Sequence, residues 1–189
     1  ESNIIIATTF KNYPHNIKKN LIDNFYKVLE SKISYLSNPN IIFISSASVY
    51  GLSNSKLSFM EESKINIENK YSYEKILFEN LLDEICNSAN GKCIILRPSG
   101  LFGKFELLEK ANNLIDRLYK SLITNQVIEL EIEYGGNQLR DFLHIYDLFR
   151  VICHVSINIE FISKRSNTEI YNVSNNKIYT IDKVIEIAK

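Results

Sequence analysis

Ile41-Ile-Phe-Ile-Ser-Ser-Ala-Ser-Val-Tyr-Gly51 is an apolar run of strand length that ends in hydroxyl side chains. Twenty-five residues after Ser46, the sequence Tyr71-Ser-Tyr-Glu-Lys75 opens a segment with helical character. Residues four apart lie on one face of a helix, so Lys75 is expected beside Tyr71. Its ammonium would favour the phenolate and lower the pKa of the phenol. Together the strand end and the helix predict a proton-transfer site.

A Tyr four residues before a Lys is a weak signal by itself in a chain with 11 Tyr. A second match, Tyr179 to Lys183, has no hydroxyl-rich strand end ahead of it. We interpret this second pair as part of an ordinary amphipathic helix. For Tyr71 the alternative is an interfacial tyrosine beside a solvated lysine, and the segments around it argue against that alternative.

Short apolar segments alternate with longer segments of helical periodicity, which indicates a parallel α/β sheet. The alternation predicts strands at about 3–7, 41–45, 92–97, 127–133 and 170–173, and helices at about 16–36, 71–88, 106–123, from 147 and 180–189. Gly91 is expected to take the left-handed conformation that ends a helix. Asp147 is expected to cap the start of the helix that follows it.

The chain has 189 residues, 45% apolar and 23% charged, which suits one globular domain with a real core. Its formal net charge is zero, and no basic stripe favours nucleic acid as a partner. No apolar run approaches the ~18 residues of a membrane span, so no membrane partner is expected. The three cysteines lack metal-ligand spacing and the three histidines are scattered. We therefore expect buried free thiols, no metal site and a reducing, cytoplasmic location.

Four segments resemble the extended short-chain dehydrogenase/reductases, in particular the NAD-dependent epimerase/dehydratase group that modifies nucleotide sugars. They are 41–51 with its Val-Tyr-Gly ending, 71–82, Cys93-Ile-Ile-Leu-Arg-Pro-Ser-Gly-Leu-Phe-Gly103 and Gly136-Asn-Gln-Leu-Arg-Asp-Phe-Leu-His-Ile-Tyr-Asp-Leu148. A fifth, weaker match is Ile170-Tyr-Asn-Val-Ser-Asn175. The segments follow one another in the family's order and spacing over nearly the whole chain.

The resemblance implies a Rossmann-like, doubly wound parallel α/β sheet that is incomplete at its N-terminus. Residues 1–103 would be the C-terminal part of an NAD(P)-binding domain, and 104–189 a mixed region of substrate-binding and last Rossmann elements. The sequence contains no Gly-x-x-Gly-x-x-Gly, although a dinucleotide site needs a glycine-rich turn at a helix N-terminus. By resemblance, the sequence is the middle of a longer protein, and the cofactor site within it is incomplete.

The resemblance also implies roles for single residues. Ser46 would hydrogen-bond the reacting sugar oxygen, Tyr71 would act as acid and base, and Lys75 would hold the nicotinamide ribose. The cofactor-binding set is Ala7, Thr8, Ser45, Tyr71, Lys75, Pro98 and Ser99. The substrate-binding set is Ser46, Ser48, Gly100 and Arg140. The guanidinium of Arg140 suits a diphosphate; the alternative is a surface ion pair with Asp141 or with another neighbour.

Two departures narrow the implied activity. Ala47-Ser48 stands where the 4,6-dehydratases have an Asp-Glu pair, so dehydration is not expected. Gly100 stands where UDP-galactose 4-epimerases have a substrate-binding Asn, which weakens that assignment.

The implied function is an NAD(P)-dependent nucleotide-sugar epimerase or keto-sugar reductase that transfers hydride at a hexose carbon, C4. NAD or NADP would be the cofactor and a nucleoside-diphosphate sugar the substrate. A homodimer would pair through the Tyr71 helix and the long helix before it. The apolar positions Ile76, Leu77, Leu81 and Leu82 allow this pairing, but they could equally be core residues against the sheet. The alternative is a non-catalytic Rossmann-like binding or scaffold protein, or an inactive fragment.

Overall fold

The computed structural model describes residues 3–6, 24–25, 27–31, 38–51, 58–103, 113–127, 129, 136–162 and 166–188. Ala7 and Thr8, both predicted to contact the cofactor, lie outside these ranges. So do most of the predicted helix 16–36 and most of the predicted strand 127–133, although 24–25 and 27–31 are helical.

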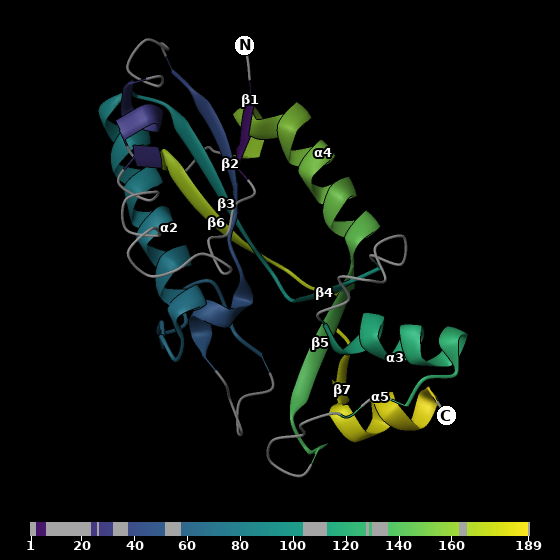
Figure 1. Cartoon of the computed structure of the whole chain (residues 1–189). Coiled ribbons are helices and arrows are strands. Elements are labelled where there is room, and N and C mark those ends of the chain that lie inside the picture. Colours follow the sequence, from purple (N-terminus) through teal and green to yellow (C-terminus); the bar gives the residue numbers. More distant parts are fainter. Residues whose placement is uncertain are drawn as a thin grey trace.

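A central sheet of four parallel strands has the order β1-β2-β3-β6 (Figure 1). The strands are β1 (Asn3–Ile6), β2 (Asn40–Ile44), β3 (Lys92–Pro98) and β6 (Thr168–Val173). Helix α2 (Lys70–Ser88) packs on one face of this sheet, and α4 (Ile145–Ile162) packs on the other. The predicted Rossmann-like, doubly wound parallel arrangement is therefore confirmed.

A second, smaller sheet follows the carboxyl end of the central one (Figure 1). It contains β4 (Gly100–Phe102), β5 (Leu139–His144) and β7 (Ile178–Thr180), with β4 parallel and β7 antiparallel to β5. Helices α3 (Leu114–Thr124) and α5 (Ile181–Ile187) belong to this part. Ser99 alone separates β3 from β4, and β5 leads directly into α4. These short connections fix the second sheet beside the carboxyl edge of the first.

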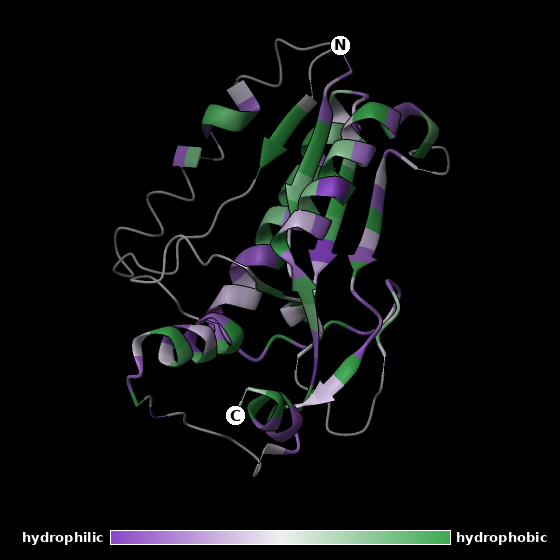
Figure 2. Cartoon of the chain, turned by 90° about the vertical axis from the view of Figure 1, so that its right-hand side faces the viewer, coloured by the Kyte–Doolittle hydropathy of each residue, from purple (hydrophilic) through white to green (hydrophobic). Residues whose placement is uncertain are grey.

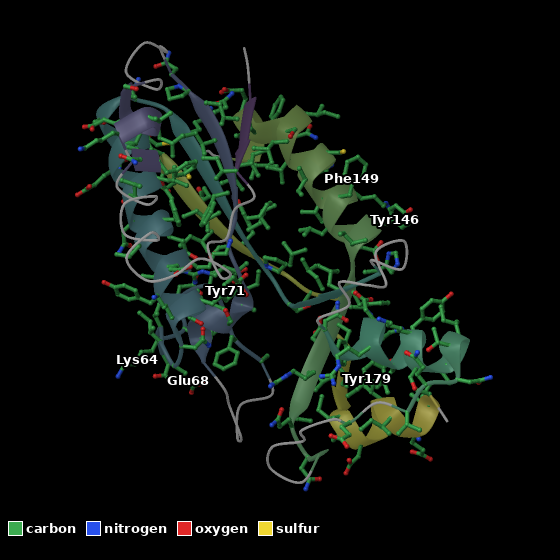
Figure 3. All side chains as sticks on the ribbon, viewed as in Figure 1. Lys64, Glu68, Tyr71, Tyr146, Phe149 and Tyr179 are labelled. Carbon is green, nitrogen blue, oxygen red and sulfur yellow. The ribbon has the colours of Figure 1, made fainter. Side chains whose placement is uncertain are left out.

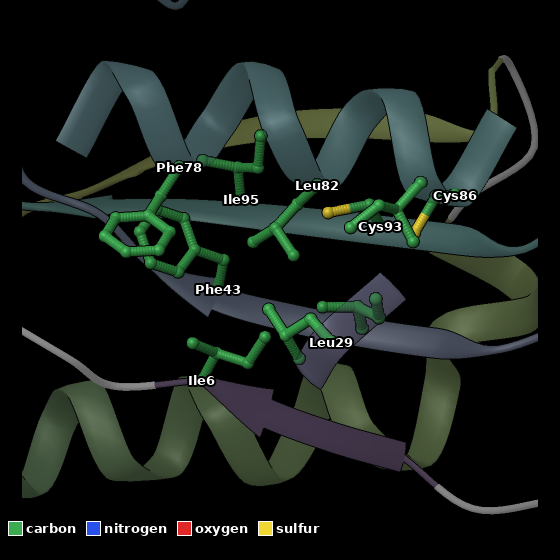
Figure 4. Close-up of a cluster of buried hydrophobic side chains, with 10 residues drawn as sticks. Ile6, Leu29, Phe43, Phe78, Leu82, Cys86, Cys93 and Ile95 are labelled. Carbon is green, nitrogen blue, oxygen red and sulfur yellow. The ribbon is translucent and has the colours of Figure 1, made fainter. Parts of the chain in front are cut away.

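Strands β2 and β3 are buried on both faces, which explains why Ile41–Ile44 and Cys93–Leu96 are continuous apolar runs. Along β2, Ile41 and Phe43 point to the α2 side, whereas Ile42 and Ile44 point to the α4 side. Figure 2 shows how strongly hydrophobic residues dominate these strands. On the α2 side, Phe78 and other apolar residues of the helix complete a dense cluster (Figure 4).

Helix α2 begins and ends with asparagines. The side chain of Asn69 accepts a hydrogen bond of 2.9 Å from the backbone N–H of Ser72, as a helix N-cap does. At the other end Asn90, with φ of 50°, takes the left-handed conformation predicted for Gly91, so that prediction is wrong. Gly91 is needed for another reason: a Cβ there would lie 2.5 Å from the carbonyl oxygen of Pro39.

Two further expectations are corrected, and the core alternative is decided for Leu82. Helix α4 begins at Ile145, so Asp147 lies in its first turn and does not precede it as a cap. Tyr179 lies on β7, and Lys183 follows on α5, so this pair does not share one helix. On α2, Leu82 is fully buried against the sheet, whereas Leu77 is partly exposed and remains available to a partner.

The cysteines are free thiols: Cys86 and Cys93 are buried, and Cys153 is half-buried. Among the described residues, none of the helices combines the length and the apolar character needed to cross a membrane. Within the same ranges, no three His, Cys, Asp or Glu side chains are grouped so that they could hold a metal ion.

Candidate active site

A cavity of about 550 Å³ opens at the carboxyl ends of β2, β3 and β6, where these strands meet β5 and β7. In open α/β sheets, ligands bind at this edge. Its lining includes Ser46, Ser48, Pro98, Ser99, Gly100 and Arg140, all predicted to contact cofactor or substrate. The structure therefore brings together residues that are up to 94 positions apart in the sequence.

Ser46 and Tyr71 form a hydrogen-bonded pair beside this cavity. Ser46 caps the short 3-10 helix η1 (Ala47–Tyr50), and its hydroxyl accepts from the N–H of Ser48 at 3.2 Å. Tyr71 lies in the first turn of α2, beside the central sheet. Figure 3 shows that Tyr179 lies with the smaller sheet instead. Burial raises the pKa of Tyr71, and the side-chain hydrogen bond with Ser46 opposes that rise only in part.

The raised pKa of Tyr71 corrects the expectation that Lys75 would lower it. Loss of hydration disfavours the phenolate, and in this structure that effect is the largest. The phenol therefore keeps its proton at neutral pH and is suited to donate it.

Lys75 lies beside Tyr71, as the four-residue spacing predicted. Its ammonium is 5.6 Å from the centre of the Tyr71 ring and 4.9 Å from that of Phe43. The side chain is only 4% exposed, and Nζ donates to the carbonyl oxygen of Ile44 at 2.7 Å. Burial lowers the pKa of Lys75 to about 8, while the charges of Glu79 and Glu74 act in the opposite direction.

Glu79, one helical turn beyond Lys75, belongs to the same face of α2 and was not predicted. It forms a buried ion pair with Arg97 of β3, in which Nη2 donates to Oε2 at 2.6 Å and Nε donates to Oε1 at 3.1 Å. Ser45 also donates its hydroxyl to Glu79 Oε1. The hydroxyl of Ser45 is thus engaged away from the cavity, whose lining does not include this residue. The four-residue repeat from Tyr71 through Lys75 was the signal that could have identified Glu79.

Arg140 lies on β5, and its hydrogen-bond partners among the described residues are neutral. Its guanidinium donates to Gln138 Oε1 at 3.0 Å and to the carbonyl oxygen of Leu139 at 3.2 Å. In the described part of the chain it makes no ion pair, so the alternative pairing with Asp141 is wrong. The Arg140 charge therefore remains available to an anion in the cavity.

Asp141 instead organises the polypeptide around the cavity. Its carboxylate accepts from the Ser99 hydroxyl at 2.5 Å and from the backbone N–H groups of Asn175 and Lys177 at 3.0 and 2.9 Å. Three hydrogen bonds to one carboxylate fix the β6–β7 connection against the β3–β4 connection. Sequence reasoning missed this role because the partners lie on two other segments, far from Asp141 in the sequence.

The model of the NAD dependent epimerase/dehydratase family matches residues 11–174. The chain belongs to the NAD dependent epimerase/dehydratase family. It is 27% identical over 190 residues to dTDP-4-dehydro-6-deoxyglucose reductase from Escherichia coli, a match that covers 97% of this chain and 56% of that protein. The chain thus spans about half the length of this curated relative.

Solved structures of the same fold include UDP-N-acetylglucosamine 4-epimerase from Methanobrevibacter ruminantium. The TM-score is 0.73 at 19% identity, over 99% of this chain and 59% of that one. The dTDP-glucose 4,6-dehydratase of Bacillus anthracis, solved with NAD, gives 0.68 at 21% identity, over 87% of this chain and 48% of that one. The family resemblance inferred from the sequence is confirmed, and its members are sugar-nucleotide epimerases, dehydratases and reductases.

Proposed function

We propose that this chain forms the catalytic part of an NAD(P)-dependent keto-sugar-nucleotide reductase that acts at a hexose carbon, C4. The observation that supports this most is the Ser46–Tyr71–Lys75 cluster beside a cavity that Arg140 also lines. Ser46 and Arg140 line this cavity, whereas Tyr71 and Lys75 do not; Tyr71 is connected to it through the hydrogen bond with Ser46.

The residues present fit the nicotinamide end of NAD(P). The ammonium of Lys75 lies at the carboxyl edge of β2, beside the Tyr71 ring, where both could donate to ribose hydroxyls. The sequence contains no glycine-rich turn for the pyrophosphate, so the fit extends to this end alone. When bound, the nicotinamide exchanges hydride with the sugar carbon.

In this proposal Tyr71 donates its proton to the oxygen of the keto sugar while that oxygen gains negative charge. Ser46 hydrogen-bonds the same oxygen and stabilises the developing charge. Burial raises the pKa of Tyr71, so the phenol holds the proton that the keto oxygen takes up on reduction. The E. coli relative, by its name a reductase of a 4-keto sugar nucleotide, supports reduction as the proposed reaction.

Epimerisation is the second candidate, because the same proton donor could serve oxidation and reduction of one bound sugar. Epimerisation is supported by the family, which includes epimerases by its name, and by the 4-epimerase that has the same fold. Arg140, which also lines the cavity, would bind the diphosphate with its planar guanidinium. The proposed substrate of either reaction is a nucleoside-diphosphate hexose.

The complete protein, incubated with NADPH or NADH, tests this proposal. With a nucleoside-diphosphate 4-keto sugar, a reductase consumes one reduced nicotinamide per product, which absorbance and NMR of the sugar measure together. An epimerase instead interconverts two 4-hydroxy sugars with no net consumption of cofactor. Absence of both reactions would contradict the proposal and favour a scaffold protein.

Lys75 should set the alkaline limit of the reaction. An ammonium with a pKa of about 8 is present below that pH and is lost as the pH rises through it. We therefore expect kcat/KM to fall on the alkaline side with a midpoint near 8, which Tyr71 cannot cause because its pKa is raised. In Lys75→Arg the midpoint should move to higher pH, since a guanidinium stays charged. An unchanged midpoint in that variant would assign the limit to another group.

A further inference from the structure

Buried polar contacts form a continuous chain from helix α2 to the far wall of the cavity. Glu79 and Arg97, each 4% exposed, make the ion pair described above. Arg97 Nη1 then donates to the hydroxyl of Tyr50 at 2.8 Å, and that hydroxyl donates to Asn172 Oδ1 at 2.8 Å. The hydroxyl of Tyr50 therefore joins η1, β3 and β6 at a single point.

The same chain of contacts holds the segment 58–63, which lies between η1 and α2. Asn172 donates through Nδ2 to the carbonyl oxygen of Phe59 at 3.0 Å and through its backbone N–H to Glu61 Oε1 at 2.7 Å. Arg97 adds a hydrogen bond to the carbonyl oxygen of Glu61 at 3.3 Å. The Phe59 ring stacks on the ring of Tyr50, with centres 5.0 Å apart and planes 5° apart. A segment without regular secondary structure is thus fixed from two strands.

This fixed segment faces the cavity. Phe59 and Tyr50 both line it, and Tyr50 belongs to the same short helix that Ser46 caps. Arg97 also lines it, but Glu79 already neutralises its charge, whereas Arg140 is free of such a partner within the described residues. Phosphate is therefore expected at Arg140, and the stacked aromatic pair belongs to the part of the cavity near Ser46.

We propose that Tyr50 and Asn172 are positioning residues that hold Phe59 as the wall against which the sugar of a nucleotide sugar packs. The identity of this ligand rests on the proposed function. Aromatic side chains provide apolar surface in ligand pockets, with a few polar groups to fix orientation. Loss of the Tyr50 hydroxyl should loosen the wall without touching the diphosphate end or the proton donor.

Tyr50→Phe tests this, because it removes the hydroxyl and keeps the stacked ring. We expect the complete protein to bind a nucleotide sugar about two- to twelvefold more weakly by calorimetry, the range for loss of the one hydrogen bond that ties Tyr50 to Asn172. Affinity for the nucleoside diphosphate alone should not change, and in turnover KM should rise while kcat is kept. Tyr73→Phe, which removes an exposed hydroxyl, is the matched control and should change nothing. Arg140→Leu should weaken both ligands alike.

Phe59→Ala provides a second variant, which removes the stacked ring but leaves the buried hydrogen bonds of the Tyr50 hydroxyl in place. It should reproduce the loss for the nucleotide sugar alone, even if Tyr50→Phe lowers the melting temperature. Equal losses for both ligands, or no loss in Phe59→Ala, would overturn the proposal. The binding measurements need no turnover, so they test the role of Phe59 separately from the proposed reaction. If the protein shows this binding pattern but reduces no keto sugar, the role of Phe59 is supported and the proposed reaction is contradicted.

Discussion

Replacement of Tyr71 by Phe is expected to lower kcat for keto-sugar reduction by about 10²- to 10⁴-fold, the usual contribution of a positioned acid or base. In the proposed reaction the phenol of Tyr71 is the proton donor to the keto oxygen, and burial raises its pKa so that it keeps its proton. Phe fills nearly the same volume and cannot donate. Ser46 would still hydrogen-bond the sugar oxygen, so a residual rate should persist.

The loss should appear in kcat rather than in binding, because the proton moves only in the transition state. KM for the nucleotide sugar is therefore expected to stay within about threefold of the wild-type value. This distinguishes Tyr71→Phe from Tyr50→Phe, for which KM is predicted to rise. Stability should change little, since one hydrogen bond contributes about 0.5–1.5 kcal/mol. Steady-state kinetics and a melting curve of the same preparation measure both quantities.

Tyr73→Phe is the control for this variant as well, since it lies two residues away on α2 and is 51% exposed. If Tyr71→Phe retains more than about a tenth of the wild-type kcat, Tyr71 is not the proton donor. If Tyr73→Phe loses as much as Tyr71→Phe, the effect comes from disturbance of the helix rather than from the chemistry.

Local periodicity predicted much of this fold and part of the site. The strands β2 and β3 could be recognised because both faces are buried, so that each contains a run of four apolar residues, 41–44 and 93–96. The position of Lys75 beside Tyr71 followed from the helical repeat, since α2 is continuous over both residues. Features that depend on one element alone were therefore accessible from the sequence.

Features that depend on several elements were not accessible. The pKa of Tyr71 is raised because the surrounding chain removes water from it, and no spacing in the sequence measures that burial. Tyr179 was assigned to a helix because Lys183 follows at helical spacing. The structure starts the helix after Thr180, whose hydroxyl accepts from the N–H of Lys183 at 3.2 Å, so a capping residue decided the boundary.

The Glu79–Arg97 pair shows the same limitation with the largest expected effect on stability. Its partners are 18 residues apart on α2 and β3, and both are almost completely buried. Arg97→Met would leave the Glu79 carboxylate buried without its counter-ion, at a cost of about 3–5 kcal/mol in the free energy of unfolding. For a chain of this size we expect the melting temperature to fall by about 6–20 °C.

The double variant Glu79→Leu with Arg97→Met should be more stable than Arg97→Met alone, although it removes more native contacts. Replacing a buried ion pair by apolar residues is often nearly neutral, because both desolvation costs disappear together. Chemical denaturation of the two single variants and the double variant therefore gives a large, favourable coupling energy in a double-mutant cycle. The exposed pair Lys183–Glu186 is the control, and its cycle should give less than about 1 kcal/mol. If the changes in the free energy of unfolding at Glu79 and Arg97 are strictly additive, the two charges are hydrated in solution. The contacts from α2 to Tyr50 could then not act as a rigid support for the cavity wall.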